Sequence, residues 1–98
     1  MANYILSKKA QNDLVDIWDY TVETWSEKQA EVYLQNFFLA FDSIASNPFS
    51  VGHSYEDVKA GYRGLHCGRH IVFYRILKNG KVRVIRVLHE RMDFGKHL

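Results

Sequence analysis

The segment Arg69-His-Ile-Val-Phe-Tyr-Arg-Ile-Leu77, with Lys78-Asn-Gly-Lys81 and Val82-Arg-Val-Ile-Arg-Val-Leu-His89 after it, decides the fold of this chain. Both flanking runs are rich in β-branched and aromatic residues, which favour strands. Asn-Gly between two such runs is a strong signal for a β-hairpin turn with positive φ at both central positions. We therefore predict an antiparallel hairpin of this kind over residues 69–89.

The two strands of this hairpin differ in regularity. The near-continuous apolar run from Ile71 to Tyr74 is typical of a central strand that is covered at least partly on both faces. On the return strand, Arg83 and Arg86 are three residues apart, so a regular strand would turn them to opposite sides. Either Arg86 points toward the helices or a bulge near Ile85 realigns it. The pattern leaves both arrangements open.

An amphipathic helical hairpin is predicted before the sheet. The first helix begins after Ser7, with Asp13 among the acids on its polar side, and Ser26-Glu-Lys-Gln29 has the form of a capping box that starts the second. Asn47-Pro48 ends the second helix, because proline lacks a backbone donor. The predicted apolar positions are Ala10, Leu14, Ile17, Trp18, Thr21, Val22 and Trp25, then Ala30, Tyr33, Leu34, Phe37, Phe38, Phe41, Ile44 and Ala45.

The remaining segments complete an α+β fold. Tyr4-Ile-Leu6 reads as an edge strand, residues 47–61 as the longest loop, and residues 62–67 as a further strand. The predicted order is an N-terminal strand, an antiparallel helical hairpin, then a three-stranded antiparallel sheet (β-α-α-β-β-β). We expect a single domain over residues 1–98, with the helices on one face of a four-stranded, mostly antiparallel sheet.

Charge is divided unevenly along the chain. Residues 62–98 hold nine Lys or Arg, including all six arginines, against two acids, a balance of 9 − 2 = +7. The first 61 residues hold four lysines against nine acids, 4 − 9 = −5, so the formal net charge is +2. A cationic sheet on an acidic helical base is suited to bind an anionic or acidic partner. We expect the arginines to converge on the face of the sheet away from the helices.

Other composition signals exclude several classes of protein. Cys67 is the sole cysteine, and the five histidines lack metal-ligand spacing, so we expect no disulfide, metal or other cofactor. There is no signal-peptide pattern and no apolar run long enough to cross a membrane. These features predict a cytoplasmic protein without membrane contact.

An ordered set of short motifs resembles the RelE/ParE superfamily of toxins from bacterial type II toxin-antitoxin systems. The motifs are Ser7-x-x-Ala10, Asp16-Ile17, Asn47-Pro48, Tyr62-Arg63, the run from Gly68 to Arg75, and the ending from Val87 to Asp93. Leu88-His89, Met92-Asp93 and His97-Leu98 look more like the ParE branch, which is associated with poisoning of DNA gyrase. The RelE branch cleaves messenger RNA on the ribosome, and the two branches share a fold.

The resemblance also implies partners. A cognate antitoxin, ParD-like or of another class, is expected to wrap the toxin in a hetero-oligomer. Operator DNA is expected to be contacted only indirectly, through the antitoxin. DNA gyrase is the expected target.

The candidate site residues depend on which branch applies. Ribonuclease chemistry needs an acid, a base and cations, and the candidates are His89, Glu90, Arg83 and Arg91. The alternation of side chains along a strand would place Arg83, His89 and Arg91 on one surface. RelE-like nucleases resemble one another in having a C-terminal tyrosine, whereas this chain has Phe94 and no tyrosine after Tyr74. We therefore expect no catalytic residues. The predicted contacts with target or antitoxin are Arg69, Arg75, Arg83, Arg86, Arg91, Met92 and Phe94.

Each candidate also has a structural interpretation. His89 can be a strand-end histidine bonded to backbone, and Arg69 can pair with a helix acid such as Asp16 or Glu23. Arg75 and Arg83 flank the hairpin turn, where cations protect a sheet edge. A different class of function is a nucleic-acid-binding module with Tyr62, Phe73 and Tyr74 as stacking platforms for bases.

Overall fold

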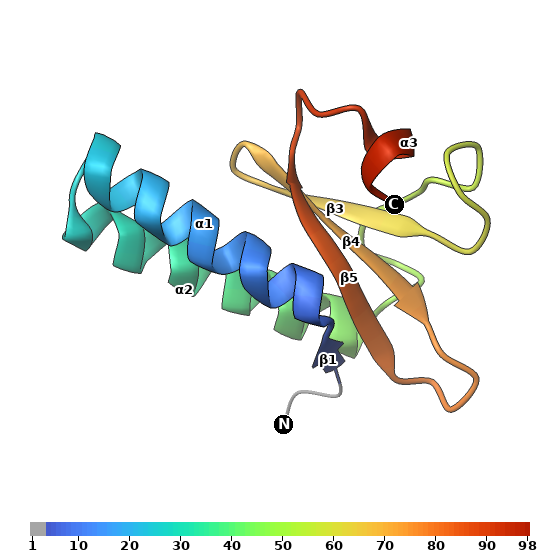
Figure 1. Cartoon of the computed structure of the whole chain (residues 1–98). Coiled ribbons are helices and arrows are strands. Elements are labelled where there is room, and N and C mark those ends of the chain that lie inside the picture. The colour runs from blue at the N-terminus through green and yellow to red at the C-terminus, as the bar shows by residue number, and fades with distance from the viewer. Residues whose placement is uncertain (1–3) are drawn as a thin grey trace.

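Two long helices and a mixed sheet make up the computed structural model, which describes residues 4–98 (Figure 1). The helices are α1 (Lys8–Thr24) and α2 (Glu27–Ser46), with a short α3 (Phe94–His97) near the C-terminus. The strands are β1 (Tyr4–Leu6), β2 (His53–Ser54), β3 (Arg63–Cys67), β4 (His70–Ile76) and β5 (Val82–His89). The predicted α+β order is confirmed, with β2 and α3 as additions.

Side-chain caps fix where both long helices begin. Ser7 Oγ accepts the backbone N–H of Ala10 at 3.0 Å, and Ser26 Oγ accepts that of Gln29 at 3.0 Å. Each cap satisfies a donor that has no partner within the helix. Ser7 Oγ also donates to the Ile85 carbonyl oxygen at 2.6 Å, which ties the start of α1 to the sheet.

The sheet has five strands in the order β1-β5-β4-β3-β2, with β4 at its centre. β1 pairs parallel with β5, and the other neighbours are antiparallel. The predicted count of four strands is therefore wrong by one. The extra strand, β2, is two residues long and pairs His53 with Gly64 and Ser54 with Arg63, so it is too short to leave a periodic pattern in the sequence.

The β4–β5 hairpin is present, but its turn differs from the prediction. Gly80 has a φ of 82°, whereas within residues 4–98 no residue other than glycine has a positive φ, so Asn79 does not. The Gly80 N–H donates to the Leu77 carbonyl and the Leu77 N–H donates to that of Lys81. This is the longer hairpin loop, in which a type I turn is followed by one left-handed glycine. Asn79 stabilises it differently, because its Oδ1 accepts the Lys81 N–H at 3.0 Å.

The main core lies between the helical hairpin and one face of the sheet. Phe37, Phe41 and Ile44 of α2 are fully buried there against Tyr74, Val82 and Val84 of β4 and β5. The helical stripes were predicted correctly except at their flanks, where Trp25 is 73% exposed and Phe38 is also exposed. Trp25 follows the end of α1, and Figure 1 shows that this end of the helical hairpin projects beyond the sheet, where no other element of the described residues covers it.

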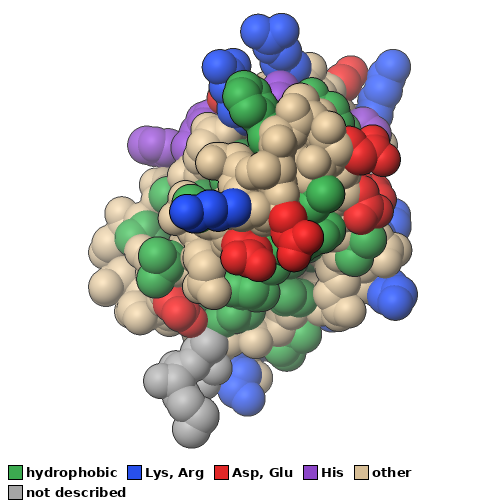
Figure 2. All heavy atoms as spheres, turned by 90° about the vertical axis from the view of Figure 1, so that its left-hand side faces the viewer, with side chains coloured by type: hydrophobic (Ala, Val, Ile, Leu, Met, Phe, Trp, Pro, Cys, Tyr) green, Lys and Arg blue, Asp and Glu red, His purple; other side chains and the backbone are tan. Residues whose placement is uncertain are grey.

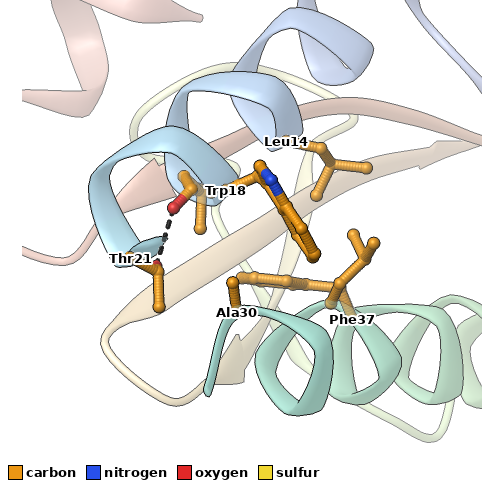
Figure 3. Close-up of a pocket in the computed structure, with 7 residues that line it drawn as sticks. Leu14, Trp18, Thr21, Ala30 and Phe37 are labelled. Atoms are coloured by element: carbon orange, nitrogen blue, oxygen red, sulfur yellow. Dashed lines mark hydrogen bonds between the residues drawn. The ribbon is translucent and has the colours of Figure 1, made fainter. Parts of the chain in front are cut away.

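The helices pack tightly against each other where they extend past the sheet. Figure 3 shows Trp18 of α1 directed toward Ala30 and Phe37 of α2, with Leu14 and Thr21 beside it. The space left among these side chains is about 10 Å³, which is about one water molecule and too small for a cofactor. Within residues 4–98, neither long helix carries an apolar stretch long enough to span a bilayer.

Candidate functional site

A β-bulge at Ile85 decides which way the arginines of β5 face. Phe73 pairs with Arg86 and Tyr74 pairs with Val84, which leaves Ile85 as an extra residue on β5. The extra residue shifts the alternation of side chains by one position. Because Val84 and Val87 belong to the core beneath the helices, Arg83 and Arg86 both lie on the opposite face. Of the two arrangements that the sequence left open, the bulge is the observed one.

Arg86 is held inside the molecule by Asp13 of α1. Its Nε and Nη2 atoms lie 2.8 and 2.9 Å from the two oxygens of Asp13, and the side chains are 17% and 13% exposed. Asp13 Oδ2 also accepts the Val87 N–H, and Arg86 Nη1 donates to the His97 carbonyl. The hydrogen bond to Asp13 raises the pKa of the Arg86 guanidinium. The charge of Arg86 is thus neutralised within the chain.

Asp13 is the residue that the sequence interpretation missed. It was assigned to the polar side of the first helix, which is wrong, because its carboxylate covers the edge of β5 beyond the end of β1. β1 pairs with β5 as far as Val84, so the Val87 N–H needs another acceptor. A signal was available: Asp13 is three residues after Ala10 and four before Ile17, both of which face the core.

A second arrangement lies on the same face as Arg86. We call it the arginine row, and it comprises Arg75, Arg83, Lys59 and Tyr62. Arg75 of β4 and Arg83 of β5 are direct cross-strand partners, and both are exposed. The Arg75 guanidinium lies 5.6 Å from the centre of the Tyr62 ring, and Lys59 Nζ lies 5.5 Å from it. Within residues 4–98, neither Arg75 nor Arg83 has an ion pair or a side-chain hydrogen bond. The row is therefore a concentration of uncompensated positive charge.

The C-terminal tail covers the middle of the same face. Phe94 of α3 lies 4.9 Å from Phe73 and 6.0 Å from Tyr55, measured between ring centres, and Leu98 joins this small cluster. Phe94, a predicted contact residue, is therefore half-buried against its own sheet. Met92 and Arg91, which precede α3, are exposed.

A group that we call the histidine corner lies where the β3–β4 turn meets the end of β5. It comprises Tyr33, His66, Arg69, His70, His89 and Glu90. Tyr33 Oη lies 2.6 Å from His70 Nδ1, and it accepts the backbone N–H of Arg69 at 3.1 Å. The rings of His70 and His89 are 5.3 Å apart. Burial, followed by the neighbouring His89, lowers the pKa of His70 from 6.5 to about 4, so His70 is neutral at pH 7.

The contacts of the other residues in the histidine corner are mostly structural. Glu90 lies 3.8 Å from His66 Nε2 and 4.0 Å from Arg69 Nη1, and its N–H donates to the Arg69 carbonyl. Arg69 therefore pairs with Glu90, and the predicted pairing with Asp16 or Glu23 is wrong. His89 Nδ1 accepts the Arg91 N–H at 3.2 Å, which is the backbone role considered for it.

The predicted grouping of His89 with Arg83 and Arg91 on one surface is also wrong. Parity along β5 would have grouped them, but the bulge at Ile85 interrupts that parity. His89 faces His70 on the helical side, whereas Arg83 faces Arg75 on the opposite side. Their partners on β4, His70 and Arg75, are five residues apart, which is about 16 Å along the strand. The titratable groups and the arginine row thus lie at opposite ends of the sheet.

The three aromatic residues considered as stacking platforms are not available for stacking. Tyr62 is 8% exposed, and Phe73 and Tyr74 are fully buried. The Tyr74 hydroxyl lies 2.7 Å from the Pro48 carbonyl oxygen and accepts from Arg63 Nε, so it fixes the loop after α2. A nucleic acid on this sheet would therefore not stack on these three rings.

Within the described residues, no three His, Cys, Asp or Glu side chains gather closely enough to hold a metal ion. Cys67 is half-buried, and burial raises the pKa of its thiol, which keeps it protonated.

Comparisons with known proteins identify the family of the chain. The family described as ParE toxin of type II toxin-antitoxin system, parDE, matches residues 4–94. Toxin ParE1 of Mycobacterium tuberculosis is 42% identical over 97 residues, covering 99% of this chain and 98% of that protein. Toxin ParE1 of Caulobacter vibrioides is 40% identical over 98 residues, covering 100% and 99%.

The fold is also shared with solved structures. A structure of the chromosomal ParDE system from P. aeruginosa matches with a TM-score of 0.77 and 19% identity, covering 88% of this chain and 92% of that one. A structure of the RelBE2 toxin-antitoxin complex from M. tuberculosis matches with a TM-score of 0.62 and 20% identity, covering 89% and 95%. The whole-length sequence matches establish the family, and the chain belongs to the ParE toxins of type II toxin-antitoxin systems.

Proposed function

We propose that this ParE toxin acts on DNA gyrase by binding, and that it forms and breaks no bond itself. The observation that carries the choice of binding over cleavage is the separation of the arginine row from the histidine corner. Ribonuclease chemistry requires an acid, a base and cations around one phosphate. Here the arginine row lies about 16 Å along β4 from His70 and His89, with the bulge turning the two groups to opposite faces.

Binding alone is sufficient for the proposed effect. Gyrase passes through a covalent intermediate with cleaved DNA, and a ligand that prefers this intermediate over the resealed state increases its population. A preference of about 1.4 kcal/mol gives tenfold accumulation. We assign the contact to exposed residues, which are Arg69, Arg75, Arg83, Arg91 and Met92. Arg86 and Phe94 support that surface from within.

We also propose an antitoxin that neutralises the toxin by covering two kinds of surface. The similar P. aeruginosa structure is described as a ParDE toxin-antitoxin system. Exposed apolar side chains on the helical hairpin, among them Tyr20, Trp25 and Leu39, offer anchors for an amphipathic segment. Figure 2 views this side of the molecule, where apolar side chains lie among acidic ones. Carboxylates of the antitoxin would then pair with the cationic sheet.

The test compares the two candidate targets directly. Purified toxin is added to gyrase with supercoiled plasmid and, separately, to an in vitro translation reaction. We expect cleaved plasmid to accumulate while the messenger RNA stays intact. Cleaved messenger RNA with unaffected gyrase would reverse the choice in favour of a ribonuclease.

Expression in cells separates a toxin from a harmless binding module. Induction of this chain alone should arrest growth, and induction together with the antitoxin gene should restore it. Normal growth on induction alone, from protein that is demonstrably folded, would contradict the proposal.

A further inference from the structure

We propose that the arginine row binds the phosphate backbone of duplex DNA directly, independently of any protein target. The first reason is the placement of Arg75 and Arg83 as direct cross-strand partners. Like charges in this position weaken a sheet. Within residues 4–98 no carboxylate forms an ion pair with either guanidinium. An anion bound between them would remove the repulsion.

The second reason is that Arg75 is held ready for an external acceptor. Its guanidinium lies over the Tyr62 ring and also against the backbone of Gly61, where an added Cβ would lie 3.3 Å from Arg75 Nη2. Stacking fixes the plane of a guanidinium but does not use its N–H donors. Lys59, on the same ring, is held by a hydrogen bond of 2.9 Å to the Leu98 carbonyl oxygen. Binding therefore requires little further ordering of either side chain.

The third reason concerns the kind of anion. An acidic protein segment normally adds apolar anchors to its carboxylates, and most large exposed apolar side chains lie on the helical hairpin, away from the row. Single-stranded nucleic acid needs exposed aromatic faces, but Tyr62 and Phe73 are buried. At Arg75 and Arg83 what remains is a cationic surface whose own aromatic neighbour, Tyr62, is buried, and such a surface is suited to a duplex backbone without sequence preference.

The charges around the row favour the same ligand. Lys78 and Lys81 in the hairpin turn are exposed and extend the positive surface beyond Arg75 and Arg83. Glu56, an acid in the adjoining loop, accepts a hydrogen bond from the Gly61 N–H. Within residues 4–98 Glu56 forms no ion pair with Arg75 or Arg83, so both guanidinium groups can still pair with an external anion.

The test measures binding of the purified toxin to a fluorescent 20-base-pair duplex by anisotropy, over a series of NaCl concentrations. The variant Arg75→Gln/Arg83→Gln removes the row. The matched control, Lys8→Gln/Lys9→Gln, removes the same charge from exposed positions at the start of α1. We expect several-fold weaker binding by the row variant alone. Its slope of log affinity against log salt concentration should be shallower by roughly 1.8, because each phosphate contact contributes about 0.9.

Thermal unfolding and two competing ligands complete the test. Thermal unfolding should show the row variant to be at least as stable as wild type, because the repulsion has been removed, so weaker binding cannot be blamed on misfolding. Equal affinities and slopes for the row variant and the lysine control would overturn the proposal. Tighter binding to a single strand of the same length, or to poly-glutamate at equal charge, would overturn it in favour of those ligands.

The result of the duplex-binding assay is independent of the gyrase proposal, because the assay contains no gyrase. A toxin that binds duplex DNA through the row but leaves gyrase unaffected would retain this inference and refute the proposed target. A toxin that poisons gyrase with no measurable duplex binding of its own would do the reverse.

Discussion

At the scale of single residues, Asp13 connects the first helix to the sheet. Its carboxylate binds the Arg86 guanidinium with both oxygens and accepts the Val87 N–H, so it joins α1 to the unpaired edge of β5. Both side chains are largely shielded from water. In such a place the loss of one partner is costly, because the remaining charge is left without compensation.

We predict that Asp13→Asn lowers the free energy of unfolding by about 2 to 4 kcal/mol, because the amide keeps the shape but not the charge. Urea denaturation of the toxin measures this effect. Asp16→Asn, at an exposed position of the same helix, should change the value by less than about 0.5 kcal/mol. Equal effects of the two substitutions would mean that the Asp13–Arg86 pair contributes nothing specific.

His70 should make stability depend on pH. Its folded-state pKa is about 4 and its ordinary value is 6.5, so between these pH values the unfolded chain binds more protons than the folded one. Stability should therefore fall as the pH decreases from about 6.5 toward 4. The variant His70→Asn, which keeps a polar atom near Tyr33, should show a weaker pH dependence. His53→Asn, at an exposed position, should leave the dependence unchanged, and the opposite ranking of the two variants would refute this account.

At the scale of elements, local signals in the sequence were enough where one residue controls one backbone feature. Ser26 caps α2 as predicted, α1 begins after Ser7 as predicted, and the apolar run of β4 lies at the centre of the sheet. The type of the hairpin turn was harder to predict, because Asn-Gly is compatible with more than one kind of hairpin loop. The bulge at Ile85 involves contacts with β4 and with Ser7, which are distant in sequence. Periodicity along β5 therefore indicated two possible arrangements but could not choose between them.

The hairpin turn provides a prediction at this scale. Gly80→Ala should lower the free energy of unfolding by about 1 to 2 kcal/mol, because φ is 82° at this position. The loss should not be larger, because no neighbouring atom would clash with the new Cβ. Asn79→Ala should cost less, because Asn79 has a negative φ and loses one exposed hydrogen bond to Lys81. Urea denaturation measures both variants. A larger loss for Asn79→Ala would indicate the turn with two left-handed residues that the sequence first suggested.

At the scale of the whole molecule, the arginine row and the histidine corner lie at opposite ends of the sheet. The sequence predicted the division into an acidic helical half and a basic sheet half, since it follows from counting residues. It did not predict which arginines are available to a partner. Arg86 is paired with Asp13 and Arg69 approaches Glu90, whereas in the described part of the chain Arg75 and Arg83 face each other and form no ion pair with an acid. These differences arise from tertiary contacts, which one sequence does not display.

The most direct test of the central claim, that the cations act and the titratable groups do not, is gyrase-dependent plasmid cleavage by two variants of equal stability. Arg83→Gln/Arg91→Gln removes cations, and His89→Asn/Glu90→Gln removes the only acid and base once proposed for chemistry. We predict that the first variant loses most of the cleaved-DNA accumulation and that the second retains it within a few-fold of wild type. Loss of activity in the second variant with retention in the first would contradict the account.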